Sequence, residues 1–321
     1  MQEQEIKQLV GQMRSGDMRA LSRLMTLVEN DAESIPVVMC EVYFARRHAR
    51  RIGIAGPPGS GKSTLIANII QHTNTLGLRT GVLCVDPTSP ISGGAILGDR
   101  VRMSIPEIHP DTFIRSIASG GSLGGLAAVT RFHAILLEAF GADLILIETI
   151  GIGQVGYDIR DNAETLILVL VPESGDTIQV LKSGILELAD IIIVNKSDRE
   201  GATGMVETLK STIETTRNLW RIPIVMTSAL HDKGTAELWD AIESHKQWIA
   251  EKKSTSQDED YLNDLRDALM IQLKAQLTPE FIMNHPLFKS SGEKVKKGIL
   301  DPYSAARNIL NDILNSAECR I

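Results

Sequence analysis

Seven short apolar runs constrain the fold of this chain more than any other feature of its sequence. Most of these runs are continuously apolar over the length of a strand, and a helix, a loop or both separate each run from the next. Strands that are buried on both faces and joined by helices are typical of a parallel, doubly wound α/β sheet. We predict this fold class, with strands at 51–56, 81–86, 112–117, 144–148, 165–171, 189–195 and 222–228.

Helical segments flank the predicted sheet on both sides. Near the N-terminus, Ile6, Leu9, Val10 and Met13 recur at the spacing of one helix face. The polar stretch EKKSTSQDED at 251–260 has the composition of a linker, and helical patterns resume beyond it. The expected parts are an N-terminal helical extension at 1–50, the α/β domain at 51–253 and a C-terminal helical arm at 254–321.

The charge balance and the cysteine content argue against several classes of protein. The chain carries a net charge of −7, whereas nucleic-acid binding normally needs a basic face, so we expect no nucleic-acid partner. Cys40, Cys84 and Cys319 are far apart and form neither a zinc motif nor a disulfide framework. The apolar runs are shorter than the roughly 20 residues that a bilayer needs. We therefore expect no membrane association and a cytoplasmic location, or the mitochondrial matrix if a transit peptide has been removed.

The stretch GPPGSGKST at 56–64 fits the phosphate-binding pattern G-x-x-x-x-G-K-[ST]. It follows a predicted strand and opens a predicted helix, which is the context that the motif requires. Glycines let successive N–H groups point at phosphate oxygens, and the helix N-terminus adds its positive dipole end. The lysine would neutralise the β- and γ-phosphates, and the serine after it would bind Mg²⁺. The predicted nucleotide-binding residues of this loop are Gly56, Gly59, Ser60, Gly61, Lys62, Ser63 and Thr64.

A second motif, NKSD at 195–198, predicts which base is bound. The carboxylate of Asp198 can accept from both the ring N–H and the exocyclic amine of guanine. Adenine offers no such pair of donors and would leave the carboxylate unpaired. Asn195 can brace the neighbouring loop, and the stem of Lys196 can cover the base. After the next strand, a backbone N–H can meet the guanine carbonyl from the loop of Ser228, Ala229 and Leu230.

Three acidic residues near strand ends are candidate ligands of a magnesium ion. Asp86 and Glu148 each end an apolar run, and open α/β sheets bind ligands outside the carboxyl ends of their strands. Asp99 lies in the sequence ILGDR, where capping a helix is the alternative role. Arg100 and Arg102 follow closely, and either can meet phosphate charge or lie solvated at the surface.

With these motifs in place, the chain resembles a known family, the GTPases associated with methylmalonyl-CoA mutase, or MeaB/ArgK group. The resemblance covers roughly residues 50–250. Its second and third blocks are more specific than a phosphate loop, because generic GTPases do not carry them. It implies a P-loop GTPase fold with helical extensions at both ends. The blocks are GIAGPPGSGKSTLI, VDPTSPISGGAILGDRVRM, FIRSIASGGSLGGLA, DLILIETIGIGQ, VPESGDTIQVLKSGILELADIIIVNKSD and TSALHDKGTAELWDAI.

The resemblance also assigns roles to particular residues. It places ETIG, from Glu148 to Gly151, where most GTPases carry the phosphate-sensing Asp-x-x-Gly motif. Gly151 is accordingly an expected nucleotide-binding residue. The implied metal ligands are Ser63, Asp86, Asp99 and Glu148. The residues that we expect to act in catalysis are Lys62, Glu148, Asp86 and Arg102, and the expected switch residues are Gly175, Asp176, Gln179 and Lys182.

In function, the resemblance implies a magnesium-dependent GTPase that acts as a chaperone of an adenosylcobalamin-dependent acyl-CoA mutase. Family members gate cofactor loading, protect or reactivate the mutase, and form homodimers through the C-terminal arm. We expect GTP and GDP as substrate and product, and no cobalamin bound directly by this chain. Methylmalonyl-CoA mutase is the favoured partner, while isobutyryl-CoA, ethylmalonyl-CoA and 2-hydroxyisobutyryl-CoA mutases stay open.

One segment departs from the family pattern. After Gln154 the family usually continues with Ser-Glu, whereas this chain has Val155-Gly156-Tyr157-Asp158, so hydrolysis or coupling to the partner can differ. Gln154 is a candidate for orienting water, with a cap or loop hydrogen bond as the alternative. The competing functions are a nickel-insertion metallochaperone GTPase, a P-loop kinase, and a scaffold that binds GTP without hydrolysing it. Scattered histidines argue against the first of these.

Overall fold

The chain folds as two compact units, Met1–Asp264 and Leu265–Ile321. The N-terminal helices and the sheet belong to the same unit. The computed structural model describes residues 1–31, 33–86, 111–118, 126–149, 159–160, 162–172, 185–213, 220–252, 265–266, 268–270, 272–273, 277 and 279–318.

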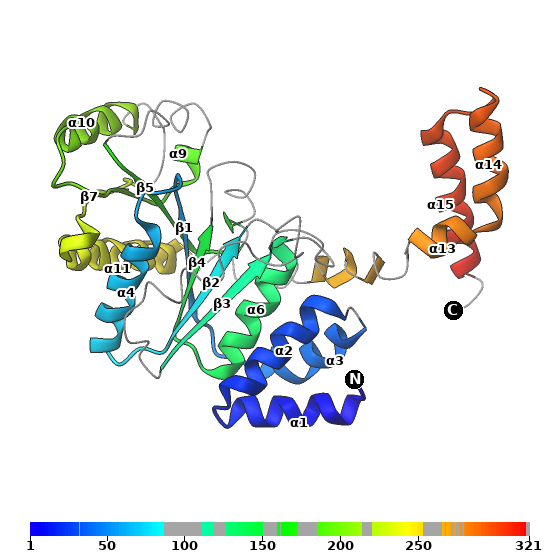
Figure 1. Ribbon diagram of the computed structural model, residues 1–321, viewed down its shortest axis with the longest axis horizontal. Helices are drawn as coiled ribbons and strands as arrows, with labels where there is room; N and C mark the ends of the chain where they lie inside the picture. The colour runs from blue at the N-terminus through cyan, green and yellow to red at the C-terminus, as the bar shows by residue number, and fades with distance from the viewer. Residues whose placement is uncertain are drawn as a thin grey trace. The chain divides into compact units, whose positions relative to one another are not determined.

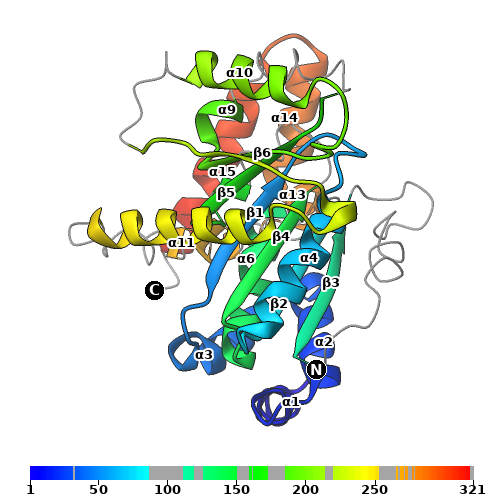
Figure 2. The same cartoon turned by 90° about the vertical axis from the view of Figure 1, so that its left-hand side faces the viewer.

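Within these residues, the first unit is built on a seven-stranded sheet whose neighbouring strands are all parallel (Figures 1 and 2). The strand order is β3-β2-β4-β1-β5-β6-β7. Each predicted strand and the doubly wound fold class are confirmed. The strands are β1 (Arg50–Ala55), β2 (Thr80–Asp86), β3 (Thr112–Ala118), β4 (Leu144–Thr149), β5 (Thr165–Leu170), β6 (Ile191–Val194) and β7 (Ile224–Met226).

The strand order reverses direction at β1. From β1 the chain first builds one side of the sheet, through β2, β3 and β4, and then builds the other side, through β5, β6 and β7. Such a switch point leaves a crevice outside the carboxyl ends of the central strands, where open α/β sheets bind their ligands. The segment that follows β1 therefore occupies the position that a ligand-binding loop needs.

Helices cover both faces of the sheet, which explains why β4 and β5 are buried along their whole length. On one face, α4 (Lys62–Thr75) and α11 (Thr235–Lys252) share a core with the strands. On the other face, α10 (Ala202–Ile213) packs against β5 and β6. There α6 (Leu126–Phe140) lies so close to β2 that a Cβ added at Gly81 would meet Leu137 Cδ1 at 2.7 Å. Two short elements, α9 (Ile185–Leu188) and the 3₁₀ helix η2 (Ala229–His231), complete this part.

The N-terminal helices form a small layer against α6. They are α1 (Glu3–Arg14), α2 (Met18–Asn30), α3 (Ser34–Val42) and the 3₁₀ turn η1 (Tyr43–Ala45). The predicted apolar face of the first helix is confirmed, because Ile6, Leu9, Val10 and Met13 are all buried.

A charged contact fixes this layer to the sheet. Glu29, on α2, accepts hydrogen bonds from Arg115 of β3, with the shorter at 2.7 Å, and its Oε1 lies 3.0 Å from Nε2 of His133 on α6. Burial raises the pKa of the Glu29 carboxyl, but His133 and Arg115 outweigh it and hold that pKa below its usual range. The N-terminal helices are therefore joined to the sheet by partly buried charges as well as by apolar packing.

The second unit consists of helices that leave many apolar side chains in solvent. Its described helices include α13 (Pro279–Asn284), α14 (Pro286–Lys296) and α15 (Pro302–Glu318), and α14 packs against α15. Phe281, Met283 and Tyr303 are among the exposed large hydrophobic residues. In the described part of the chain, no helix combines the length and apolar character that a membrane crossing requires.

Candidate functional site

The loop between β1 and α4 adopts a conformation that depends on glycine. Gly59 and Gly61 have φ angles of 75° and 91°, in the left-handed region that other residues rarely adopt. At Gly61 there is no space for a side chain either, because an added Cβ would lie 2.3 Å from Nδ2 of Asn195. The predicted phosphate loop is thus a tight turn that presses against the loop after β6.

Lys62 begins α4 and folds back over this turn. Its Nζ donates to the carbonyl oxygens of Gly56 and Pro57, both at 3.0 Å, and the residue is buried. Burial lowers the pKa of the Lys62 ammonium, while the nearby carboxylate of Glu148 acts in the opposite direction. The positive charge is therefore held at the mouth of the loop, where it is poorly solvated.

Glu148 reaches the same place from the end of β4. Its Oε1 accepts a 2.9 Å hydrogen bond from the hydroxyl of Ser63, and the residue is only 5% exposed. Burial raises the pKa of Glu148, against the lowering effects of Ser63, Lys62 and Cys84. The other carboxylate oxygen, Oε2, is buried and has no hydrogen-bond partner among the described residues.

These oxygen atoms fit a hard divalent cation such as Mg²⁺. A carboxylate with one unsatisfied buried oxygen and an adjacent hydroxyl are the donor types that Mg²⁺ prefers. In the described part of the chain, no group of three His, Cys, Asp or Glu residues could hold a metal. Asp86 ends β2, beside β4, but its side chain lies outside the description, as does all of Asp99. The four-residue metal site stays a prediction.

On the other side of the phosphate loop, Asn195 joins three segments. Its Nδ2 donates to the carbonyl oxygen of Ser60 at 2.7 Å. Its Oδ1 accepts from the hydroxyl of Thr227 at 3.0 Å and from the backbone N–H of Ala229 at 3.1 Å. Asn195 is 2% exposed, so these bonds are shielded from water. One side chain thus holds the phosphate loop and the two predicted base loops together.

Exposed Asp198 and buried Ser228 also bring the two predicted base loops together. The hydroxyl of Ser228 donates to Asp198 Oδ1, and this bond is the largest cause that lowers the pKa of the exposed Asp198 carboxyl. Below them, the N–H of Ser197 donates to the carbonyl of Thr227 at 2.9 Å. Lys196 has a φ angle of 56°, an uncommon left-handed conformation for this residue type. The NKSD segment therefore turns sharply at Lys196 and does not continue as extended backbone.

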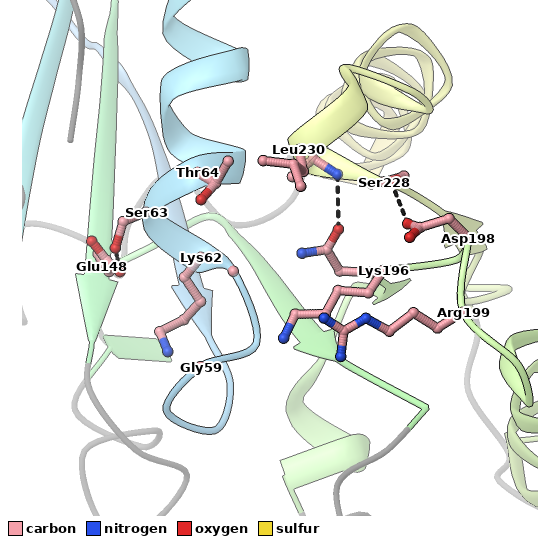
Figure 3. A pocket seen from close by; sticks show the side chains of 13 residues that line it. Gly59, Lys62, Ser63, Thr64, Glu148, Lys196, Asp198, Arg199, Ser228 and Leu230 are labelled. Carbon is pink, nitrogen blue, oxygen red and sulfur yellow. Dashed lines mark hydrogen bonds between the residues drawn. The ribbon is translucent and has the colours of Figure 1, made fainter.

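Between these segments lies a pocket of about 380 Å³ (Figure 3). Glu148 and Ser63 lie at one end of the view, and Asp198 and Ser228 lie at the other. Arg199 also lines the pocket, and the sequence analysis missed it, although its position directly after Asp198 was a usable signal. Gly56 and Ser60 belong to the same loop but do not line the pocket. The lining residues are Gly59, Gly61, Lys62, Ser63, Thr64, Glu148, Asn195, Lys196, Asp198, Arg199, Ser228, Ala229 and Leu230.

The remaining predicted site residues lie outside the described part of the chain and stay predictions. They are Asp99, Arg100, Arg102, Gly151, Gln154, the departing segment 155–158, and the switch residues Gly175, Asp176, Gln179 and Lys182.

Comparison with known proteins places the chain in a family. The family model described as "Methylmalonyl Co-A mutase-associated GTPase MeaB" matches residues 21–278. A protein of Pyrococcus horikoshii is 40% identical over 323 residues, covering 97% of this chain and 99% of its own length. The mitochondrial methylmalonic aciduria type A homolog of Mus musculus is 31% identical over 322 residues, covering 92% of this chain and 76% of its own.

More distant relatives extend the likeness. The GTPase ArgK of Escherichia coli is 28% identical over 325 residues, and the alignment covers 96% of this chain and 96% of ArgK. A crystal structure described as an LAO/AO transport system kinase aligns over 98% of this chain and 99% of its own, with a TM-score of 0.68 and 22% identity, which supports the fold. Taken with the phosphate loop and the base loops around one pocket, the matches show that this chain belongs to the methylmalonyl-CoA mutase-associated GTPase family and is a GTPase.

Proposed function

We propose that the pocket binds GTP, with the phosphates at the 56–64 loop and the guanine at the loops after β6 and β7. The observation that carries this proposal is that one pocket is lined by both sets of residues, which are more than a hundred positions apart in the sequence. A nucleoside triphosphate needs a cationic, N–H-rich end and a polar end that reads the base. This pocket provides Lys62 and the start of α4 at the first end, and Asp198 at the second.

Base selection follows from the charge state of Asp198. An exposed aspartate is ionised at neutral pH, and the Ser228 hydroxyl lowers the pKa of Asp198 further, so the carboxylate can accept two hydrogen bonds from guanine. An adenine base would leave those acceptors unpaired. The stem of Lys196 and the side chain of Leu230 line the same end of the pocket and offer apolar surface to the base.

At the phosphate end, this chain supplies charge and hard oxygen ligands. Ser63 and Glu148 would hold Mg²⁺, which, when bound, neutralises charge that develops on the phosphates. Lys62 lies close enough to stabilise the same charge, and its three N–H donors can exchange the carbonyls of Gly56 and Pro57 for phosphate oxygens. Asp86, Asp99 and Arg102 complete the proposed catalytic group.

The biological role that we propose is chaperoning of an adenosylcobalamin-dependent acyl-CoA mutase, with methylmalonyl-CoA mutase favoured. The description of the family model, which names that mutase, supports this role. The chaperone would act as a homodimer, gate cofactor loading and respond to nucleotide through residues 175–182. The exposed apolar side chains of the second unit are compatible with dimerisation through this arm.

The experiment that tests this role mixes the full chain with candidate mutases in the presence of GDP, GTP or a non-hydrolysable GTP analogue. Complex formation and the rate of GTP hydrolysis are measured together. A nucleotide-dependent complex with stimulated hydrolysis is the expected result. If no mutase binds or changes the rate while guanine nucleotides still bind, the chaperone role is refuted and the nucleotide site stands.

A further inference from the structure

Asn68 makes a contact with the base loop that no sequence motif indicated. It lies on α4 one helical turn after Thr64, which lines the pocket, so both side chains lie on the same side of the helix. Its Nδ2 donates a 2.8 Å hydrogen bond to the carbonyl oxygen of Ala229, the first residue of η2. The helix that begins at the phosphates thus also holds the loop at the base end.

This contact helps to fix the peptide group between Ala229 and Leu230, whose carbonyl also accepts a longer hydrogen bond, of 3.4 Å, from the N–H of Asp232. The N–H of Ala229 is already engaged, because it donates to Oδ1 of Asn195 at 3.1 Å. The next N–H along the chain, that of Leu230, lies in the first turn of a helix, where backbone donors have no intrahelical acceptor. In a planar trans peptide the C=O and the N–H point in opposite directions. Holding the Ala229 carbonyl toward α4 therefore turns the Leu230 N–H away from α4.

We propose that Asn68 is a positioning residue for base recognition, which aims the Leu230 N–H at the carbonyl of a 6-oxopurine base. This inference rests on the proposed guanine site and extends it. Leu230 is one of the residues that line the pocket, at the loop where we propose that the base binds. The 6-carbonyl is the group that distinguishes guanine from adenine on this edge, and a preset N–H donor favours it. Asn68 thereby couples the seating of α4 at the phosphates to the reading of the base.

The test compares two nucleotides that differ at this carbonyl. GDP carries it, whereas 2-aminopurine riboside diphosphate keeps the exocyclic amine for Asp198 but lacks the 6-oxygen and, with it, the ring N1–H. The analogue should therefore bind more weakly to the unmodified protein, and the test compares only the change in affinity that each variant causes for each nucleotide. Asn68→Ala should weaken GDP binding roughly threefold to tenfold, the effect of losing one neutral hydrogen bond, and change binding of the analogue by less than about twofold. Asn68→Asp keeps the shape but loses the donor, and should weaken GDP binding further.

Gln71→Ala is the matched control, because Gln71 is an exposed amide side chain three positions along the same helix. It should leave the dissociation constants of both nucleotides unchanged. Equal losses for GDP and the analogue in both Asn68 variants would show a purely structural role and overturn the inference. The inference would also be overturned if both Asn68 variants bound GDP with the same affinity as Gln71→Ala. If the unmodified protein itself binds GDP and ADP equally, the guanine site fails, and the inference fails with it for that separate reason.

Discussion

Replacing Asn195 with alanine tests whether one side chain holds the nucleotide site together. The substitution removes three hydrogen bonds, to the carbonyl of Ser60, the hydroxyl of Thr227 and the N–H of Ala229. Each neutral hydrogen bond contributes about 1 kcal/mol, and burial of the partners prevents water from replacing all of them. We expect the free energy of unfolding to fall by about 2–4 kcal/mol.

Nucleotide binding should weaken in the same variant. Once the Asn195 amide is gone, binding must align the phosphate loop with the base loops. If alignment costs about 1.4–2.8 kcal/mol, GDP affinity falls roughly tenfold to hundredfold. The assays are urea unfolding without nucleotide and displacement of a fluorescent GDP analogue. Asn30→Ala is the control, since Asn30 is exposed and makes one local hydrogen bond, to the carbonyl of Thr26.

The two measurements refute different parts of the reasoning. If Asn195→Ala unfolds at the same urea concentration as Asn30→Ala, the three bonds do not stabilise the fold as argued. If it is destabilised but still binds GDP normally, the loops are aligned by other contacts, and Asn195 is structural only. The geometry predicts that Asn195→Ala lowers both the free energy of unfolding and the affinity for GDP, and that Asn30→Ala lowers neither.

Three further predictions concern single positions. Gly61→Ala should abolish tight GDP binding, because the φ angle of 91° disfavours alanine and the added Cβ would lie 2.3 Å from Nδ2 of Asn195. Gly11→Ala is the control and should bind GDP normally, because a Cβ at Gly11 on α1 would meet no atom within 4 Å. Asp198→Asn should shift preference from GDP toward the xanthine nucleotide in competitive binding, since the amide reverses the hydrogen-bond polarity; an unchanged preference would remove Asp198 as the base reader. Glu29→Gln should cost roughly 2 kcal/mol of unfolding free energy at neutral pH. This difference in unfolding free energy should shrink as the pH falls from about 4.3, the pKa of glutamate in the unfolded chain, through the lower pKa of Glu29 in the folded protein. Over that range the native carboxylate becomes protonated and loses its ionic contacts. A difference that stays the same at every pH in urea titrations would contradict this reasoning.

The strands were predictable because parallel strands covered on both faces must be apolar along their whole length. The run at 222–228 was predicted longer than the strand, which spans only Ile224–Met226. Pro223 has no N–H for the ladder. At the other end, the N–H of Thr227 still donates to the carbonyl of Val194 on β6, but Ser228 pairs with Lys233 in the base loop instead of with the sheet. The phosphate and base motifs were predictable for a different reason. Their chemistry demands particular residue types at fixed local spacing, and those spacings are visible in the sequence.

Contacts between distant elements were not predictable from such spacings. Asn68 and Ala229 are 161 positions apart, and Glu29 and Arg115 are 86 apart. Nothing in the local pattern around an asparagine on a helix says which carbonyl it meets, because that depends on how two elements pack. The sequence therefore predicted groups that line the pocket and one that braces them, Asn195, but it did not indicate Asn68 or the contact between Glu29 and Arg115.

Glu148 shows how the two kinds of information combine. The sequence places this acid at the end of a buried strand. The structure shows that burying its carboxylate costs free energy, because Oε2 has no hydrogen-bond partner among the described residues and burial raises the pKa of the carboxyl. A divalent cation at that oxygen would favour the ionised form and offset the cost of burial. Ser63, Lys62 and Cys84 lower the pKa of this carboxyl, but burial outweighs them. The cost of burying this carboxylate is therefore a physical argument for the metal that we propose at this position.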